Sequence, residues 1–423
     1  MNFKPITSCF FKRKLHLLAF LVLIILLGET SVFSGEIKVR PAFSVRGTYD
    51  DNINFTQRNK IDDYITTIIP SLDLTRVSEK SRMEIGGSVN VKRYSKKQRF
   101  NKTNQHYNLA FDYIPSPLFT INADGSFTLD TTTESELEET GLRYEHTVDR
   151  KAYRFQPGFA WSLSEVDSLS LNAGYSRVEY DEPFYLGYDN YSDYDSYNGA
   201  LSWSHALSKD VATFFVNGGY SMTSYERDFY KEAFYKEISN ETKTDKTGSY
   251  SLYSGFNFSF SPKWSLNLWA GARRTISDYY QIKPDKTKKE WTDRNWGGIG
   301  NISIRRSFER GYISAELSKD IIPSGRGETL ERDLAGIRIN YGFTKRLNGA
   351  LSGSWSSSES ERDHGTIDED YYSFTSSLTY QVLDKTTAEL SYSRYQSKDH
   401  SDFSKARRDV VFIQITTHLE KLL

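Results

Sequence analysis

The sequence predicts an all-β fold, a transmembrane up-and-down antiparallel β-barrel of about eighteen strands, from three observations. Apolar or aromatic residues alternate with small or polar ones along most of the chain. Aromatic residues make up 15% of the sequence, although its mean hydropathy is only -0.59. Short and long connections also alternate between the periodic stretches. Together these features favour a sheet with one face in lipid and the other in water.

The clearest alternation covers residues 249–260 and continues from Trp264 onward, after a tight turn at residues 261–263. A period of two places successive side chains on opposite faces of a β-strand. One face of this hairpin is therefore apolar and the other is small or polar. The apolar face carries Tyr250, Leu252, Phe256, Phe258, Phe260, Trp264, Leu266 and Leu268.

Similar patterns follow one another from residue 37 to residue 419. The predicted strands lie within residues 37–49, 64–76, 82–94, 106–114, 118–130, 153–161, 169–175, 197–203, 212–220, 249–260, 264–268, 296–304, 313–317, 335–341, 347–355, 372–380, 388–392 and 409–419. Trp161, Trp203 and Trp264 fall near the short turns, whereas Trp296 and Trp355 fall toward the long connections. Because tryptophan prefers membrane interfaces, these positions favour two aromatic girdles over a soluble core.

The connections fall into two sets. The short ones have about three to five residues, as hairpin turns do. The others are long and polar, and cover residues 50–63, 95–104, 132–149, 182–193, 226–245, 282–289, 322–332, 359–370 and 397–408. Outer-membrane barrels combine short periplasmic turns with long extracellular loops in this way. A soluble propeller or sandwich also has many short strands, but it would not need this asymmetry.

A sheet that spans the membrane must close into a barrel, because the hydrocarbon of the lipid offers no hydrogen-bond partner to the N–H and C=O groups of an open edge. About ten residues per strand suffice to cross a bilayer, so the longer patterns predict walls that project beyond the outer surface. Pro70 and Pro157 lie inside strand patterns, and each removes one hydrogen bond from the ladder. We expect β-bulges at these two positions, or strand ends shifted by a few residues.

The first 34 residues are expected to be a secretory signal peptide, followed by a single barrel domain over residues 35–423. Lys4, Lys12, Arg13 and Lys14 precede a short apolar run at residues 17–27. The alternative, a membrane anchor, would need a run of about 20 residues. Cys9 is the one cysteine in the sequence and lies within this leader, so no disulfide or thiol metal site is expected in the barrel.

Side chains that alternate with the apolar face should line the lumen. The charged candidates are acidic on the early strands and mainly basic on the later ones, which predicts a transverse field across a water-filled pore. The alternative is that these charges pair with neighbours on the wall and fill the interior. The pore-lining candidates are Arg40, Arg46, Asp73, Glu84, Asp112, Asp124, Asp130, Arg154, Arg273, Arg305, Glu316 and Arg338.

No catalytic, cofactor or metal motif stands out, so we expect a protein that is not an enzyme and has no cofactor. Asp363 and His364, near Glu361 and Asp368, form the one cluster that suggests rim chemistry, and a solvated loop explains them better. The tyrosine- and aspartate-rich residues 185–197 suggest sugar or calcium binding, but they lack EF-hand spacing. The net charge of -1 gives no reason to expect a nucleic-acid partner.

The first predicted hairpin carries a recognisable motif. Residues 49–53 read Tyr-Asp-Asp-Asn-Ile and residues 68–72 read Ile-Ile-Pro-Ser-Leu. This arrangement resembles the second type of outer-membrane β-barrel porins, whose genes often lie near exopolysaccharide or exosortase genes. The motif covers two strands only, and it implies a fold and a genomic setting more than a solute. Barrels of this sort commonly end on an aromatic residue, whereas this chain ends His418-Leu-Glu-Lys-Leu-Leu423, with Phe412 further back.

We therefore expect a porin-like channel in the outer membrane of a Gram-negative cell, for polar solutes or as part of polysaccharide export. The alternative is a structural or surface-binding barrel with a closed lumen, acting through its extracellular loops. The expected partners are outer-membrane lipid and lipopolysaccharide, the barrel-assembly machinery and polysaccharide.

Overall fold

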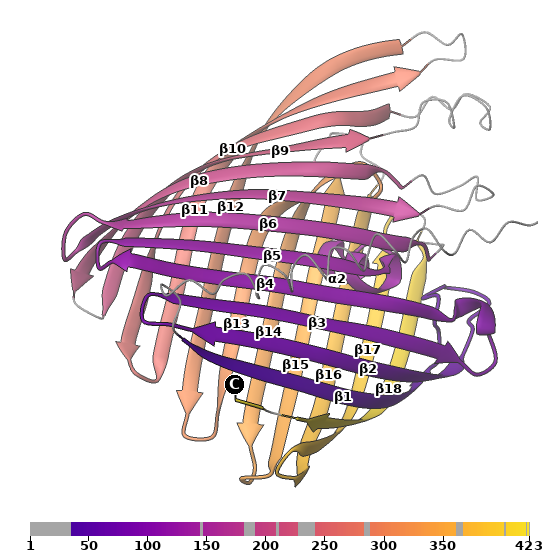
Figure 1. Cartoon of the computed structure of the whole chain (residues 1–423). Helices are drawn as coiled ribbons and strands as arrows, with labels where there is room; N and C mark the ends of the chain where they lie inside the picture. Colours follow the sequence, from indigo (N-terminus) through magenta and orange to yellow (C-terminus); the bar gives the residue numbers. More distant parts are fainter. Residues whose placement is uncertain are drawn as a thin grey trace, which may run out of the picture.

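The chain forms one closed antiparallel barrel (Figure 1). The computed structural model describes residues 35–143, 147–181, 191–208, 211–226, 242–282, 288–360, 367–401, 403–419 and 421–422. Its strands are β1 (Glu36–Asp50), β2 (Asp63–Val77), β3 (Ser81–Tyr94), β4 (Lys102–Ser116), β5 (Phe119–Thr131), β6 (Asp149–Ser162), β7 (Asp167–Asp181), β8 (Asp193–Ser208), β9 (Ala212–Glu226), β10 (Thr242–Ser261), β11 (Trp264–Ile282), β12 (Lys288–Phe308), β13 (Gly311–Pro323), β14 (Thr329–Gly342), β15 (Leu347–Ser360), β16 (Asp368–Leu383), β17 (Thr386–Asp399), β18 (Lys405–His418) and β19 (Lys421–Leu422). The predicted signal peptide lies outside the described residues.

Each strand pairs with its neighbours in the chain, and β1 closes the barrel by pairing with both β2 and β18. The β1–β18 register runs from Ala42 opposite His418 to Asp50 opposite Val410. The two-residue β19 extends this seam, with Leu422 opposite Lys38. The prediction of an up-and-down barrel of about eighteen strands is confirmed.

The outer surface is apolar, as the alternation predicts. On β10, for example, Leu252 is 64% exposed and Phe260 is 62% exposed, although both are large hydrophobic residues. Trp161, Trp203 and Trp264 are also exposed near the short turns. A barrel that presents such side chains outward, with small and polar ones inward, has the exterior of an outer-membrane β-barrel.

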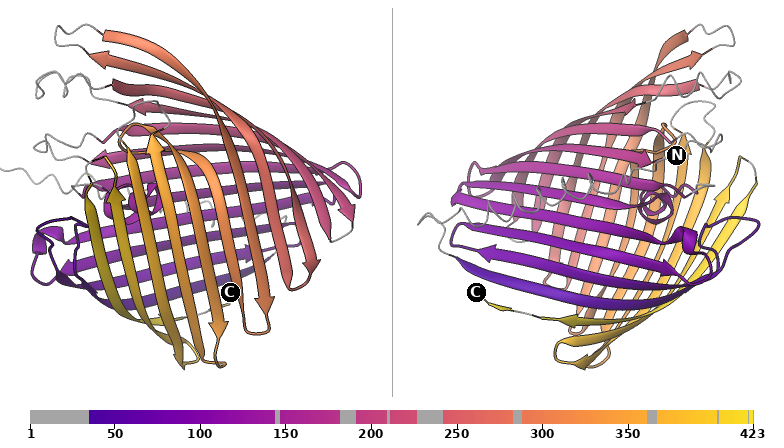
Figure 2. Two further views of the ribbon diagram at one scale, coloured as in Figure 1. Left: turned by 180° about the vertical axis from the view of Figure 1, so that it is seen from behind. Right: turned by 45° about the vertical axis from the view of Figure 1, so that its right-hand side comes forward.

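The barrel wall is uneven in height. β10 has 20 residues, β11 has 19 and β12 has 21, whereas the other barrel strands have 13 to 16. In both views of Figure 2 this part of the wall rises above the rest, at the end opposite the short turns. The longest strands are therefore gathered on one side of the barrel, whereas the projection of the wall beyond the membrane stays a prediction.

The expectation of bulges at Pro70 and Pro157 is wrong. The β2–β3 ladder pairs Ile68 with Val91 and resumes at Ser71 with Ser88, which keeps the same register. The β6–β7 ladder skips two positions around Pro157 in the same way. Each proline thus removes local hydrogen bonds without inserting a residue, because the pairs on both sides hold the register. Register shifts occur instead next to hairpin turns, as between Phe258 and Ser261, and at the loop end of β10, between Thr244 and Lys246.

In the described part of the chain, helical structure is limited to η1 (Gln98–Phe100), η2 (Thr132–Glu136) and α2 (Leu137–Thr140). Among the described residues, no helix is long and apolar enough to cross a membrane.

Candidate functional site

A segment that the sequence predicted as an extracellular loop lies inside the barrel. Residues 132–143, here called the strap, follow β5 and carry η2 and α2 into the lumen, where α2 is visible in Figure 1. Thr132, Glu136 and Leu142 are each 0% exposed. The prediction for residues 132–149 is thus wrong over the strap, because a polar lumen accepts a polar, acidic segment as readily as bulk water does.

The conformation of the strap depends on a glycine at the end of its helical turn. Leu137–Thr140 form a single helical turn that ends at Gly141, whose N–H donates to the Leu137 carbonyl at 2.9 Å. Gly141 has a φ of 73°, a conformation that glycine adopts without strain. A Cβ there would also lie 2.8 Å from the Ser356 Oγ. Both the backbone conformation and the close approach to β15 therefore require glycine.

The strap crosses the whole lumen. It leaves the wall at β5 and β6 and contacts β14 to β16, which lie about half-way around the barrel in the strand order. Ser358 on β15 donates to the Thr140 carbonyl at 2.6 Å. Leu142 packs in a buried cluster with Leu330 and Ile367. The segment is therefore fixed to opposite walls.

The first anchor, here called the latch, holds the strap to the wall where it begins. Glu134 accepts from the Lys92 Nζ at 2.6 Å and pairs with the Lys102 Nζ at 2.7 Å, and it also accepts from Asn104. Lys92 and Lys102 are opposite each other in the β3–β4 register. Burial alone would raise the pKa of Glu134, but Lys102 and Lys92 outweigh it and hold the pKa well below its usual range.

The second anchor is the carboxylate of Glu136. It lies 3.1 Å from the Nε of Arg150 on β6 and accepts from the Tyr180 hydroxyl at 2.6 Å. The backbone N–H of Gly325 donates to it at 2.8 Å. Arg150 is 2% exposed and also pairs with Glu139 at 2.5 Å. Because this carboxylate is buried, removing one of its partners would leave a polar group without compensation, which is costly.

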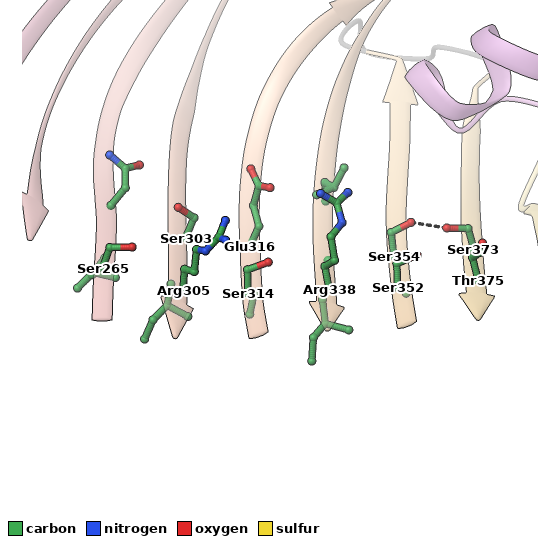
Figure 3. Close-up of a pocket in the computed structure, with 18 of the residues that line it drawn as sticks. Ser265, Ser303, Arg305, Ser314, Glu316, Arg338, Ser352, Ser354, Ser373 and Thr375 are labelled. Carbon is green, nitrogen blue, oxygen red and sulfur yellow. Dashed lines mark hydrogen bonds between the residues drawn. The ribbon is translucent and has the colours of Figure 1, made fainter. Parts of the chain in front are cut away.

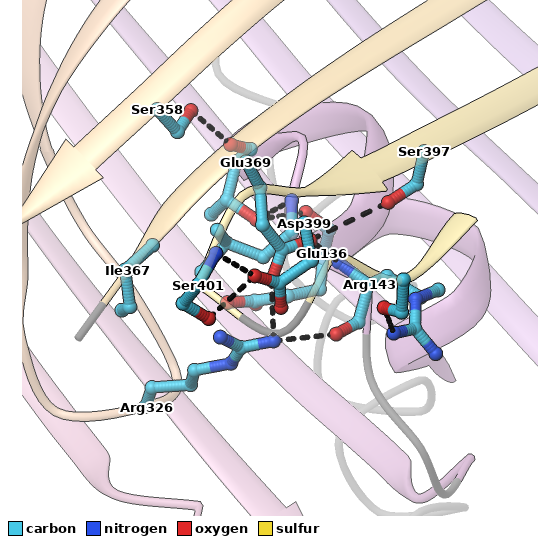
Figure 4. A network of polar contacts seen from close by, with 12 residues as sticks. Glu136, Arg143, Arg326, Ser358, Ile367, Glu369, Ser397, Asp399 and Ser401 are labelled. Atoms are coloured by element: carbon cyan, nitrogen blue, oxygen red, sulfur yellow. Dashed lines mark hydrogen bonds and ion pairs between the residues drawn. The ribbon is translucent and has the colours of Figure 1, made fainter. Parts of the chain in front are cut away.

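The third anchor joins the end of the strap to the opposite wall (Figure 4). Glu369 on β16 is 1% exposed and accepts from the Arg326 guanidinium at 2.7 Å and from the Arg143 N–H at 2.8 Å. Arg326 also donates to the Arg143 carbonyl at 2.5 Å. Charged groups from the strap, from the β13–β14 connection and from β16 thus meet in one network.

Two further connections fold inward beside the strap. Phe55 is 1% exposed and packs with Leu137, Tyr371 and Ala406. Residues 324–328 form a short turn in which Ser324 is fully buried. The predictions of solvated extracellular loops at residues 50–63 and 322–332 are therefore wrong for these parts of the chain. The apolar strap and loop side chains form their own small core at the loop end of the barrel.

The motif at residues 49–53 has a structural role here. Asp50 is fully buried and accepts two hydrogen bonds from the Arg408 guanidinium across the β1–β18 seam, at 2.9 and 2.5 Å. The Asn52 side chain donates to the carbonyls of Thr56 and Arg407 at 2.8 and 2.9 Å. The motif therefore ties the first loop to the strand that closes the barrel.

Two cavities inside the barrel are lined in part by the strap. Cavity 1 has a volume of about 800 Å³ and is lined by Glu138 of the strap and by β10 to β17. Serine and threonine side chains make up much of its wall, beside the charged Arg305, Glu316 and Arg338 (Figure 3). The labelled residues include Ser265, Ser303, Ser314, Ser352, Ser354, Ser373 and Thr375. Short hydroxyl side chains leave the lumen wide and hydrogen-bonding on this side.

Cavity 2 has a volume of about 420 Å³ and lies against β5 to β10. Glu139 and Thr140 of the strap form part of its lining, together with the end of β13. Its wall is again rich in hydroxyl and amide groups. They belong to Ser126, Thr128, Ser176, Ser196, Asn198, Ser221, Thr223, Thr247 and Ser249.

Three of the twelve predicted pore-lining residues come together in cavity 1. Arg305, Glu316 and Arg338 lie on β12, β13 and β14 and point into the space between those strands (Figure 3). The Arg305 guanidinium lies 3.8 Å from the centre of the Tyr312 ring. Glu316 accepts from the Asn301 amide at 2.9 Å.

Three others lie near the strap or cavity 2. Arg154 lines cavity 2. Asp130 is 2% exposed and accepts from the Ser135 hydroxyl of the strap. Arg273 is also 2% exposed and pairs with Glu331 at 2.6 Å. These last two are buried by neighbours, as the alternative interpretation of the lumenal charges expects.

The remaining six are spread over β1 to β5. Glu84 pairs with Arg82 on its own strand. Arg46 donates to Gln414 at 2.7 Å and lies over the Phe412 ring. The other four stand opposite polar or charged residues in the strand register. They are Arg40 opposite Asp73, Asp112 opposite Asn122, and Asp124 opposite Gln156.

Sequence reasoning missed the anchors of the strap. Lys92 stands at a lumenal position of a predicted strand, whereas Lys102 falls in a predicted connection and Arg150 just before a predicted strand. Their partners are 11 to 42 residues away in the sequence. Arg326 and Glu369 lie in or next to predicted loops. The sequence signal for the strap was the acidic run at residues 134–139, together with basic residues on the lumenal faces of the strands. This combination indicates an inserted segment only after a barrel has been assumed.

The loop candidates lie largely outside the described residues. They are residues 361–366 with His364, residues 182–190 of the tyrosine-rich stretch, and residues 227–241. Within the described ranges, no three His, Cys, Asp or Glu side chains are arranged to hold a metal ion.

Comparison with known proteins shows similarity of fold. OpdK from Pseudomonas aeruginosa, solved with vanillate, matches with a TM-score of 0.43 and 11% identity over 90% of this chain and 99% of that one. The siderophore receptor PiuA from Acinetobacter baumannii matches with a TM-score of 0.43 and 11% identity over 88% of this chain and 81% of that one. The ferric citrate transporter FecA, in its unliganded form, matches with a TM-score of 0.46 and 9% identity over 88% of this chain and 61% of that one, so this chain spans less than two thirds of FecA. No protein-family profile and no curated protein sequence matches the chain. The likeness is therefore one of barrel fold alone.

Proposed function

We propose that this protein is a porin-like channel of the outer membrane, whose lumen is narrowed by the strap. The observation that carries the proposal is the pair of cavities of about 800 and 420 Å³, both lined by hydroxyl and amide groups inside a closed barrel. A lumen built only for stability would be filled with bulky side chains, as in small barrels. Polar solutes can exchange hydrogen bonds with water for hydrogen bonds with this wall.

The solute class that suits this wall is neutral and rich in hydroxyl groups. Serine, threonine and asparagine side chains both donate and accept hydrogen bonds, as sugar hydroxyls do. The motif at residues 49–53 and its resemblance to barrels associated with exopolysaccharide support a role in polysaccharide export. More specifically, we propose that saccharides pass through the channel, in either direction.

The wall charges add a preference for ions. Asp112 and Asp124 lie on β4 and β5, and Arg305 and Arg338 lie on β12 and β14. Among the described residues none of these four forms an ion pair, and the two sets lie far apart in the strand order. They support the transverse field expected from the sequence, which would orient dipolar solutes in the pore. Reversal potentials in a salt gradient test this, since neutralising both arginines should shift selectivity toward cations.

A second candidate function follows from the strap itself. Because three carboxylate anchors fix it to opposite walls, the barrel is also suited to a closed, structural role in which the loops bind a surface. Lipopolysaccharide is a partner in either case. Arg274 lies 5.7 Å from the ring centre of the exposed Trp296 on the outer face, where lipid phosphates would meet them.

Planar-bilayer recordings separate the two candidates. The purified full-length protein should insert and give stepwise ionic currents, and a variant with residues 133–142 replaced by a short Gly-Ser linker should give larger steps. Silence of the native protein, with currents only in the shortened variant, would favour the closed structural barrel. Silence of both would exclude the channel, provided that both remain folded by circular dichroism in detergent.

A further inference from the structure

Three aromatic side chains lie on the lumenal face of the barrel, where the alternation predicts polar residues. They are Phe215 on β9, Tyr253 on β10 and Trp269 on β11. Tyr253 lies 4.4 Å from Trp269 and 6.4 Å from Phe215, measured between ring centres. Each ring lies on the same face of its strand as residues that line the cavities, which are two to six positions away along the strand. This group is here called the aromatic step.

The aromatic step lies between the two cavities. Along the inner face of β10, Ser249 lines cavity 2 and Asn257 lines cavity 1. Tyr253 is half-way between them, about 13 Å from each at the rise of a β-strand. The strap anchors described above lie on β3, β4, β6 and β16, away from this part of the wall. The step therefore lies on the wall between the linings of the two cavities, away from the strap anchors.

Two glycines let the rings lie against the wall. A Cβ on Gly255 would come within 2.4 Å of the Trp269 Cβ, and a Cβ on Gly271 would come within 2.3 Å of the Tyr253 Cβ. Glycine opposite each ring removes this clash. Covering glycine with a neighbouring ring also stabilises a sheet on its own account, which is the structural alternative that a test must separate from binding.

Hydrogen-bonding groups surround the rings. Asn267 donates to Asn257 at 2.6 Å, two residues along the strands toward cavity 1. Asn301 is opposite Trp269 in the β11–β12 register and donates to Glu316. Aromatic faces beside amides and a carboxylate suit a ligand that has apolar C–H faces and a rim of hydroxyl groups. Pyranose rings have this combination, whereas a small aromatic acid would need a cation beside the rings.

From this arrangement we infer that the aromatic step is a binding site for neutral oligosaccharides, which carries a sugar chain past the strap from one cavity to the other. The inference rests on the proposed channel function and names its ligand class and contact residues. Each ring offers a π face and each amide offers both a donor and an acceptor. A chain of sugar units can thus exchange one stacking contact for the next without leaving the wall.

Maltohexaose is a suitable probe, because it is neutral, soluble and longer than the step. In planar bilayers it should block the ionic current reversibly at millimolar concentration, whereas polyethylene glycol of similar mass should block only weakly. Trp269→Ala and Tyr253→Ala should each raise the dissociation constant of block about tenfold. Tyr253→Phe should retain most of the block, because it keeps the ring.

Matched controls lie on the outer face of the same sheet. Tyr250→Ala on β10 and Trp296→Ala on β12 remove the same side chains from exposed outward positions and should leave the block unchanged. Equal loss of block in inner and outer variants would show a structural effect and overturn the inference. Stronger block by benzoate than by maltohexaose, or no block in a protein that conducts ions, would also overturn it while leaving the channel intact.

The sugar-binding site can be tested even if the protein proves not to be a channel. If the protein carries no current, quenching of tryptophan fluorescence by maltohexaose in detergent still reports on the step. Saturable quenching that is lost in Trp269→Ala but kept in Trp296→Ala would support the site without the channel. Absence of saturable quenching in the native protein would refute the site.

Discussion

Neutralising the latch should free the beginning of the strap. In Glu134→Gln the amide cannot pair with Lys92 and Lys102, which are only 20% and 18% exposed and stand opposite each other on β3 and β4. Removing one partner of a buried charge pair costs about 3–5 kcal/mol. Because the site is partly solvated, we take about 2–3 kcal/mol, which shifts the equilibrium between docked and released strap by a factor of about 30–150.

Single-channel recording is the appropriate assay, because it counts strap openings one at a time. The Glu134→Gln protein should show more frequent and longer high-conductance events than the native protein at neutral pH. The anchors at Glu136 and Glu369 remain, so the strap should return rather than leave the lumen permanently. Adding Lys92→Met should reverse part of the effect, because it removes the repulsion between the two lysines.

Glu138→Gln is the matched control, since it makes the same change in the same segment at a side chain that faces cavity 1. Gating in this variant should resemble that of the native protein. Identical gating in Glu134→Gln and Glu138→Gln would refute the reasoning, because it would show that the latch does not hold the strap.

Four other perturbations test the same structure. Lys102 and Lys92 hold the pKa of Glu134 below its usual range, so the latch contributes fully above about pH 4.3 and weakens as pH falls through the lower, folded-state pKa. The difference in gating between the native protein and Glu134→Gln should therefore persist down to about pH 5 and shrink in stronger acid, where Glu134 is itself neutral. Gly141→Val should displace the end of the strap, by backbone strain and by contact with β15, and raise mean conductance. Phe55→Ala should lower the free energy of unfolding by about 3–5 kcal/mol in denaturant titrations. Leu201→Arg, on the lipid face, should cost about 2–4 kcal/mol of folding free energy in vesicles, whereas Ser202→Arg, on the lumenal face, should cost much less; equal costs would show that the assigned faces are wrong.

The barrel was predictable because its signal is local. Alternation at Tyr250, Leu252 and Phe260 sets which face of β10 meets lipid, and the same period recurs in the other strands. Hairpin turns then set the register of each neighbour, so a correct period implies a nearly correct sheet. Even Pro70 and Pro157 do not disturb it, because the flanking pairs keep the register.

The strap was not predictable from the same signal. Lumen and bulk water both accept polar side chains, so the hydropathy of residues 132–143 is the same for an inserted segment as for an external loop. The information that decides between them lies in pairings such as Arg143 with Glu369, which are 226 residues apart. Asp50 and Arg408, separated by 358 residues, are paired in the same non-local way. The aromatic step escaped notice because its rings interrupt the polar alternation at single positions.

The long reach of the strap constrains the order in which the protein can be built. Its attachments at Ser358, Glu369 and Ser404 belong to the final third of the polypeptide, although the strap itself follows the fifth strand. A nascent barrel that lacks its last hairpins can therefore hold this segment only through Glu134 and Glu136, on the early strands. The strap gains its contacts with the opposite wall only after the later strands have been added.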